Sequence, residues 1–164
     1  MTAGPKTAQL QIRVSAAEKA AIQRAARRAG VDMSAYVLAR ALPASARRFA
    51  ELMGACRDLD GSRFELAELS AWLAGLGAGE LRDALESPPR ELPPDLAAYV
   101  AAMVETACAR HGIAPPAWTR SIPPLAQPYF GSSLQSLRLH LLTHSPPAFR
   151  RRNLFVDASV GAQV

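Results

Sequence analysis

The stretch Ala8-Gln-Leu-Gln-Ile-Arg-Val14, followed at once by Ser15-Ala-Ala-Glu18, decides the fold of the N-terminal part of this chain. Apolar and polar side chains alternate in it, with Leu10, Ile12 and Val14 on one face and Gln9, Gln11 and Arg13 on the other. This period of two predicts a β-strand with one apolar face. Ser15 and Glu18 have the spacing of a capping box, so we expect a helix to begin directly after the strand.

Two helices are expected after this strand. The first covers residues 16–29 and ends at Gly30, a residue type that commonly ends helices. Asp32 is placed to cap a second helix over residues 33–42, before Pro43. A single strand leaves its backbone donors and acceptors unpaired, and no second strand of this kind follows nearby. We therefore expect the strand to pair with the same strand of a second copy, which gives an isologous dimer.

Residues 7–42 resemble a ribbon-helix-helix DNA-binding domain of the kind found in bacterial antitoxins. The resemblance rests on the opening R-V-S-x-x-E-K, the helix face I-x-x-A-A and the turn G-x-x-x-S-x-Y. It implies a homodimer whose two N-terminal strands pair antiparallel and enter the major groove of double-stranded DNA. A two-stranded ribbon fits that groove, and its outward side chains reach the edges of the bases.

The resemblance also implies three sets of site residues. The base-contacting set is Gln9, Gln11 and Arg13, and its chemistry agrees, because glutamine can bond adenine and arginine can bond guanine at two points. The phosphate-contacting set is Lys6, Arg28, Met33 and Ser34. The dimer core is Leu10, Ile12, Val14, Ile22, Ala26, Tyr36 and Val37. Asp32 departs from the family, which often has a neutral hydroxyl at that cap, and its charge would weaken a phosphate contact. The alternative for the polar set is an ordinary solvated strand face.

The rest of the chain is expected to be helical and interrupted by prolines. The expected helices cover residues 46–58, 65–76, 79–85, 95–111 and 133–143, with Asp95 and Gly112 at the two ends of the longest one. The fold class is therefore mainly α, with one strand per protomer at the N-terminus. Three regions are expected: a ribbon-helix-helix domain at 1–44, an acidic helical region at 45–111, and a proline-rich basic segment at 112–164.

The net charge of +5 conceals a division of charge along the chain. Residues 1–48 carry nine basic and two acidic side chains, whereas residues 49–108 carry four arginines and eleven acids. Residues 109–164 carry six arginines and one acid. A basic N-terminal part attracts a polyanion such as DNA, although a charged surface can also serve solubility alone.

Three adjacent arginines, Arg150, Arg151 and Arg152, are the sharpest feature outside the N-terminal part. Three destinations are open to them: an acidic protein partner, the acidic middle of this chain, or the DNA backbone. Aromatic residues surround them in sequence, which favours a contact surface. The expected partner-binding set is Trp118, Tyr129, Phe130, Phe149, Arg150, Arg151, Arg152 and Phe155.

Neither a catalytic motif nor a metal motif is found in the sequence, so we expect no enzyme activity and no cofactor. His140 and His144 have the spacing of a zinc pair but no third ligand nearby, and Cys56 and Cys108 lack ligand spacing. The longest apolar run covers residues 96–104, which is too short for a membrane span. No signal peptide is apparent, so we expect a cytoplasmic protein.

Together these features predict a dimeric, sequence-specific DNA-binding protein. The resemblance implies an antitoxin that represses its own operon and binds a toxin through its C-terminal region. Four stretches also resemble modules encoded beside nucleotidyltransferase-type toxins, namely Pro116-Ala-Trp118, Pro128-Tyr-Phe130, Ser136-Leu-Arg138 and Ser145-Pro-Pro-Ala-Phe-Arg-Arg-Arg-Asn153. The alternatives are an accessory protein of plasmid mobilisation or partition, and a ligand-responsive transcriptional repressor.

Overall fold

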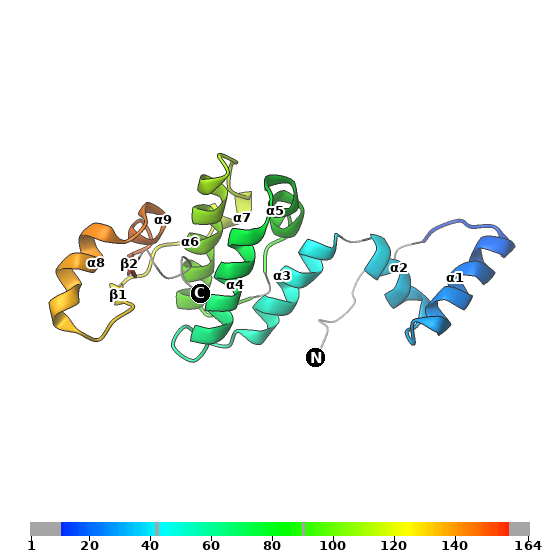
Figure 1. Ribbon diagram of the computed structural model, residues 1–164, viewed down its shortest axis with the longest axis horizontal. Helices are drawn as coiled ribbons and strands as arrows, with labels where there is room; N and C mark the ends of the chain where they lie inside the picture. Colours follow the sequence, from blue (N-terminus) through cyan, green and yellow to red (C-terminus); the bar gives the residue numbers. More distant parts are fainter. Residues whose placement is uncertain (1–10, 42, 90, 158–164) are drawn as a thin grey trace. The chain divides into compact units, whose positions relative to one another are not determined.

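The computed structural model describes residues 11–41, 43–89 and 91–157 (Figure 1). The chain divides into two units, Met1–Leu42 and Pro43–Val164, which we call the N-terminal and C-terminal units. The N-terminal unit contains α1 (Ala16–Arg28) and α2 (Met33–Ala41). The division between the units lies close to the boundary at residue 44 that the sequence predicts.

Helix α1 begins where the sequence predicts, because Ser15 and Glu18 bond to each other's backbone. The Glu18 N–H donates to Ser15 Oγ at 3.2 Å, and the Ser15 N–H donates to the Glu18 carboxylate at 2.8 Å. Gly30 follows the helix with a φ of +68°, a backbone conformation that glycine adopts without the steric penalty of a side chain. The predicted capping box and the predicted end of the helix are both confirmed.

Helix α2 has the cap that the sequence predicts. The Ala35 N–H donates to Asp32 Oδ1 at 2.9 Å, and the helix continues to Ala41. The two helices of the N-terminal unit pack against each other. Among the described residues of this unit, Ala26 alone is buried. The single chain therefore gives the N-terminal unit very little hydrophobic core.

The predicted strand over residues 8–14 is only partly within the described chain. Residues 11–14 adopt no regular secondary structure, and residues 8–10 lie outside the described part. A strand becomes regular through hydrogen bonds to a neighbouring strand. The pairing of two N-terminal strands stays a prediction.

The C-terminal unit is built around one helix that is buried along most of its length. The main helices are α3 (Ala44–Ala55), α4 (Arg63–Gly75), α5 (Ala78–Leu85) and α6 (Pro94–Arg110). Eleven of the 17 residues of α6 are buried, and α4 and α5 both pack against it. A helix that is apolar on all sides is stable only when other elements cover it, and α6 includes the long apolar run at 96–104. In the described part of the chain, the helices lack the length and apolar character of a membrane span.

These four helices match the predicted ones to within a few residues at each end. Gly112 follows α6 with a φ of +62°, as its predicted position requires. The start of α6 differs from the prediction: Pro93 is the cap and Pro94 the first helical residue, so Asp95 lies inside the first turn. Proline is well suited to that first position, because the N–H that it lacks would have had no partner within the helix.

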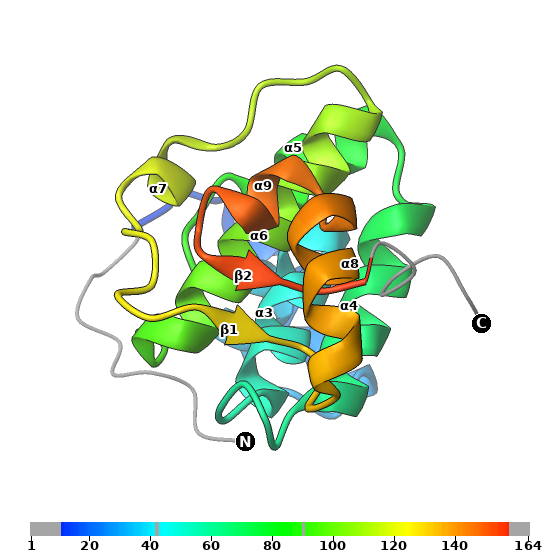
Figure 2. The ribbon, with the colours of Figure 1, turned by 90° about the vertical axis from the view of Figure 1, so that its left-hand side faces the viewer.

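The chain after α6 is more irregular (Figure 2). It forms α7 (Ala117–Arg120), the 3₁₀ helix η1 (Gln135–Leu137), α8 (Arg138–His144) and α9 (Pro147–Arg150). Figure 2 shows two short strands side by side, β1 (Tyr129–Phe130) and β2 (Leu154–Phe155), which pair in parallel. Within the described residues, η1 and α8 replace the single helix predicted over 133–143.

The acidic helical region and the basic C-terminal segment share one hydrophobic core. Phe149, Leu154 and Val156 belong to the same cluster of buried residues as Phe49 and Leu96. Helix α9 packs directly on α6. The regions predicted separately at 45–111 and 112–164 are therefore combined in one unit of the structure.

Candidate nucleic-acid interface

Two of the predicted base-contacting residues, Gln11 and Arg13, are exposed on the segment that leads into α1. Gln9 lies outside the described residues, as does Lys6 of the phosphate-contacting set. Gln11 and Arg13 alternate with Ile12 and Val14, so an extended and paired segment would present the two polar side chains on one face. Their amide and guanidinium groups have the donors and acceptors that base edges require.

The apolar residues of the same segment are left largely exposed by the described part of the single chain. Ile12 is 55% exposed and Val14 is 42% exposed. Of the other residues predicted for a dimer core, Leu10 lies outside the described residues, Ala26 is buried, and three are half-buried, namely Ile22, Tyr36 and Val37. A strand and two short helices expose too much apolar surface to be stable alone. A second copy that covers Ile12 and Val14 would remove this surface from water.

The start of α2 carries the other predicted phosphate contacts. Met33 and Ser34 are exposed in its first turn, where backbone N–H groups and the helix dipole attract anions. The carboxylate of Asp32 accepts the hydrogen bond of the Ala35 N–H at the same end of the helix. This negative charge already satisfies a first-turn donor, so the site is weaker for phosphate than one with a neutral cap.

The exposed surface of the N-terminal unit is strongly basic. Its exposed cationic side chains, within the described residues, are Arg13, Lys19, Arg24, Arg27, Arg28 and Arg40. The acidic side chains in this part are Glu18 and Asp32, and both are engaged in helix caps. Such an excess of positive charge favours a polyanion, and the affinity for DNA would then depend steeply on salt.

The predicted partner-binding aromatic residues are largely engaged inside the C-terminal unit. Phe149 is buried in the core and meets the ring of Tyr99 edge to face, with the ring centroids 5.2 Å apart. The ring N–H of Trp118 donates to the carbonyl oxygen of Leu85 at 2.9 Å. Phe149 thus has a structural role in place of the predicted surface role, because a buried ring cannot contact a partner.

The remaining aromatic residues of the predicted partner-binding set lie in the two strands. Phe130 of β1 stacks on Phe155 of β2 with the ring centroids 5.1 Å apart. The Tyr129 hydroxyl donates to Asp60 Oδ1 at 3.1 Å. All three side chains are half-buried, so each keeps only part of its surface for other contacts.

Two of the three adjacent arginines reach the acidic middle of this chain. Arg152 is buried and binds both carboxylate oxygens of Glu105, and Arg151 Nη2 lies 3.3 Å from Glu105 Oε2. Arg150 is exposed at the end of α9. The sequence left three possible binding partners for these arginines. For Arg151 and Arg152, the structure shows that the partner is the acidic middle of this chain. Burial removes Arg152 from the surface that a partner could contact.

Two phenols and two thiols of the C-terminal unit have raised pKa values. Burial raises the pKa of Tyr99 to about 12, and burial together with the hydrogen bond to Asp60 raises the pKa of Tyr129 to about 12. Burial also raises the pKa of the Cys56 and Cys108 thiols. A thiol with a raised pKa is a poor nucleophile, so neither cysteine has the environment of a reactive one.

His140 and His144 form a stacked pair on α8, with ring centroids 4.1 Å apart. His144 Nδ1 lies 3.0 Å from the His140 carbonyl oxygen, and His140 Nε2 lies 4.0 Å from Asp157 Oδ2. The described residues include no cluster of three or more histidine, cysteine or carboxylate side chains that could hold a metal ion.

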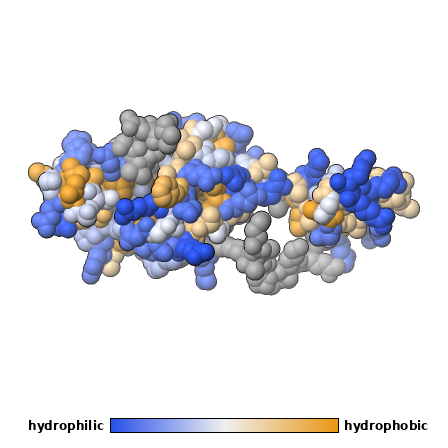
Figure 3. Space-filling view, turned by 60° about the horizontal axis from the view of Figure 1, so that its bottom comes forward, coloured by the Kyte–Doolittle hydropathy of each residue, from blue (hydrophilic) through white to orange (hydrophobic). Residues whose placement is uncertain are grey.

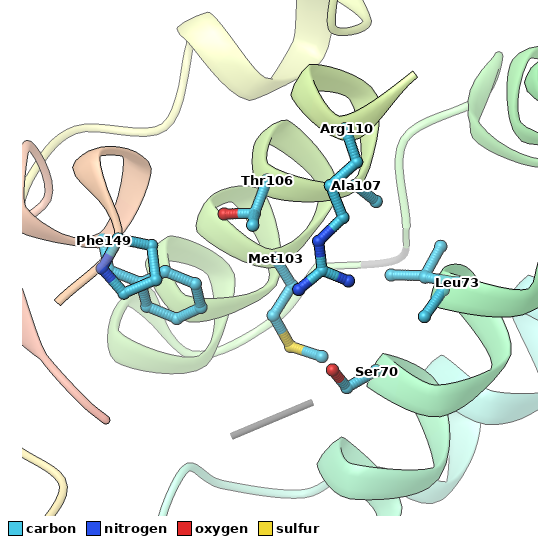
Figure 4. Close-up of a pocket in the computed structure, with 9 residues that line it drawn as sticks. Ser70, Leu73, Met103, Thr106, Ala107, Arg110 and Phe149 are labelled. Carbon is cyan, nitrogen blue, oxygen red and sulfur yellow. The ribbon is translucent and has the colours of Figure 1, made fainter. Parts of the chain in front are cut away.

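A small cavity lies between α4, α6 and α9 (Figure 4). Its volume is about 20 Å³, which is room for about one water molecule. Figure 4 shows the guanidinium group of Arg110 reaching back along α6 toward Met103, with Ser70 and Leu73 on the facing helix. This cavity is a packing gap rather than a ligand site.

An apolar surface around α8 was not predicted from the sequence. Leu134, Leu137, Leu139 and Leu142 are all exposed, and Figure 3 shows hydrophobic side chains at the left-hand end, where α8 lies in Figure 1. The signal is present in the sequence, since leucine occupies positions 134, 137, 139, 141 and 142. Exposed apolar groups gathered in this way are typical of protein–protein contact sites.

Residues 4–55 match the NikA-like family model, described as mobilization protein NikA. No curated protein and no solved structure matches the chain significantly. The matched residues include the capping box, α1, the Gly30 turn, α2 and α3. The match supports a ribbon-helix-helix DNA-binding segment in the N-terminal part of this chain.

Proposed function

We propose that this protein is a dimeric, sequence-specific DNA-binding protein that acts as an accessory factor in DNA mobilisation. The observation that carries the proposal is the match of residues 4–55 to a family described as mobilization protein NikA. The exposed basic surface of the N-terminal unit and the uncovered side chains of Ile12 and Val14 support it independently.

In the proposed mechanism, two chains pair their N-terminal strands in the major groove. Pairing buries Ile12 and Val14 against α1 and α2 of both copies and turns Gln11 and Arg13 toward the bases. A glutamine or an arginine that bonds a base at two points contributes about 1–3 kcal/mol of discrimination against the wrong base. The cationic side chains of α1, such as Arg28, add contacts to phosphates that are independent of sequence.

The C-terminal unit would then recruit a second protein to the bound DNA. Its exposed leucines around α8 give it an apolar surface, whereas the predicted aromatic contacts are largely engaged inside the unit. For an accessory factor in mobilisation, the expected partner is a relaxase, the enzyme that nicks DNA for transfer.

A second candidate role is that of an antitoxin that represses its own operon. It is supported by the resemblance of residues 7–42 to the ribbon-helix-helix domains of bacterial antitoxins. DNA recognition would be the same in both roles, and the partner of the C-terminal unit would be a toxin. Affinity purification of the tagged full chain from its own host distinguishes the two, because a relaxase supports mobilisation and a toxin supports the antitoxin role.

The DNA-binding part of the proposal is tested by selecting duplexes that bind the full chain and titrating the preferred site with Arg13→Ala. The expected loss of affinity for the preferred site is on the order of tenfold or more, with relaxed specificity at one base pair of each half-site. Arg57→Gln, which removes an exposed charge of the C-terminal unit, is the matched control and should bind like the parent. Equal binding by the parent and Arg13→Ala would contradict the assignment of the ribbon.

A further inference from the structure

A hollow on the C-terminal unit gathers three of its arginines around one carboxylate. Its lining residues are Glu105, Pro115, Arg120, Arg151 and Arg152, and its volume is about 410 Å³. They come from α6, the link that follows it, α7, and the two residues directly after α9. The hollow belongs to the C-terminal unit alone and contains none of the residues assigned to DNA recognition above.

The charges in this hollow do not balance. Glu105 supplies one negative charge, and the Glu105 carboxylate is shared between Arg151 and Arg152. Arg120 is exposed at the end of α7 and makes no ion pair with any described residue. The three guanidinium groups therefore exceed the carboxylate by two positive charges, because arginine stays protonated at any physiological pH.

One of the arginines that line this hollow has a buried donor without a partner. Arg152 is 7% exposed; Nη1 and Nη2 bond to Glu105, and Nη2 also bonds to the Thr119 carbonyl oxygen. Arg152 Nε is buried and has no hydrogen-bond partner among the described residues. A buried N–H without a partner costs about 1–3 kcal/mol, so the arginine in the wall of this hollow is not fully satisfied by Glu105 and Thr119.

We propose that this hollow binds a phosphate group. The guanidinium fork matches the oxygens of a phosphate in geometry, and such pairs are often bidentate. An excess of two positive charges fits the two negative charges of a phosphate monoester better than the single charge of a carboxylate. Arg120 and Arg151 are both exposed and would approach the anion from solvent, while Arg152 and Glu105 hold the wall of the hollow in place.

Two sources could supply this phosphate, namely a phosphorylated solute and the backbone of DNA. The charge match favours a solute that carries a terminal phosphate. The phosphates of the DNA backbone also offer oxygen acceptors, but each carries only one negative charge. The experiment below distinguishes these two sources. The proposal does not depend on the ribbon-helix-helix segment.

The first test titrates inorganic phosphate into the full chain by calorimetry, at constant ionic strength kept with chloride. The parent is expected to give a saturable signal, and the double variant Arg120→Gln with Arg151→Gln should bind at least tenfold more weakly. The matched control is Arg57→Gln with Arg82→Gln, which removes the same two charges from exposed sites elsewhere in the C-terminal unit and should bind like the parent. Since Arg151 also contacts Glu105, the single variant Arg120→Gln should weaken binding by itself while thermal unfolding stays unchanged.

The second test measures binding to a duplex of unrelated sequence at several salt concentrations. If DNA is the source, the double variant should flatten the slope of log affinity against log salt by about 0.9 for each lost contact, and the control pair should not. An unchanged slope with lost phosphate binding identifies a solute as the source. The proposal is overturned if the parent gives no saturable phosphate signal, or if the double variant binds phosphate as tightly as the parent. A parent that binds phosphate and ignores DNA would instead count against the proposed DNA-binding function alone.

Discussion

The guanidinium group of Arg152 binds both carboxylate oxygens of Glu105, with Nη1 at 3.0 Å from Oε2 and Nη2 at 2.8 Å from Oε1. Both side chains are buried. This ion pair joins the last part of the described chain to the buried helix α6, across 47 residues of sequence. The basic C-terminal segment is thereby held within the C-terminal unit, where it continues the core.

Glu105→Gln should destabilise the full chain by about 3–5 kcal/mol, because it leaves the buried charge of Arg152 without a counter-charge. Urea unfolding followed by circular dichroism measures the loss. Glu68→Gln is the matched control, since Glu68 forms an exposed ion pair with Arg48 that should contribute less than about 1 kcal/mol. If the two substitutions cost the same small amount, Glu105 does not hold the C-terminal segment in place.

Phe149→Ala should cost about 3–5 kcal/mol of unfolding free energy, because it removes a ring from the core and its edge-to-face contact with Tyr99. Phe64→Ala removes a ring that is 89% exposed and should change stability by less than about 0.5 kcal/mol. Thermal and denaturant unfolding of the two variants make the comparison. Similar stability of both would mean that Phe149 faces solvent and is free to contact a partner.

The carboxyl group of Glu18 should titrate below its ordinary value of 4.5. The Ser15 N–H lowers its pKa most and the Ser15 hydroxyl lowers it further, because both donate to the charged form. Since the folded pKa is depressed, the capping box stabilises α1 above the ordinary pKa, and this contribution is lost as the pH falls through the lowered value.

Carbon NMR of the Glu18 carboxyl group against pH measures this midpoint. Ser15→Ala keeps the backbone donor and removes the hydroxyl, so it should return the midpoint only part of the way toward 4.5. A midpoint at 4.5 in the parent, or a complete return in Ser15→Ala, would be inconsistent with the bonding of this cap.

The sequence predicts this fold best where the signals are local. Ser15, Glu18, Asp32 and Gly30 act within one turn of the helices they begin or end, so the boundaries of α1 and α2 could be placed in advance. The same holds for the apolar pattern of α6. Helix propensity and capping depend on neighbouring residues, so they can be read without knowledge of the whole fold.

The contacts that could not be predicted join residues far apart in the sequence. From the sequence, several acidic residues of the middle region could have formed ion pairs with the arginines. Glu105 is the one that does so, because α9 packs on α6 and brings Arg151 and Arg152 to it. The pairing of β1 with β2 involves two residues in each strand, too few for a period of two to be seen. Phe149 was assigned to the partner-binding set because it adjoins the three arginines, and its neighbours in the sequence do not show that its ring packs inward.

The candidate DNA interface depends on a second copy of the chain, which neither local signals nor contacts within one chain describe. Gln11, Arg13, Arg28, Met33 and Ser34 are exposed, and their contacts to DNA stay a prediction, because the strand that would organise them needs a second chain. Ile12 and Val14 are the residues on which this dimer depends, because nothing in the described part of the single chain buries them.

The most direct test of the central claim is the mass of the full chain in solution, measured by light scattering for the parent and for Ile12→Asp. The account predicts that the parent has twice the chain mass of 17.5 kDa and that Ile12→Asp is a monomer of unchanged helix content, because a charge at this position would be buried only in the dimer. A monomeric parent, or a variant that stays dimeric, would contradict the paired N-terminal ribbon.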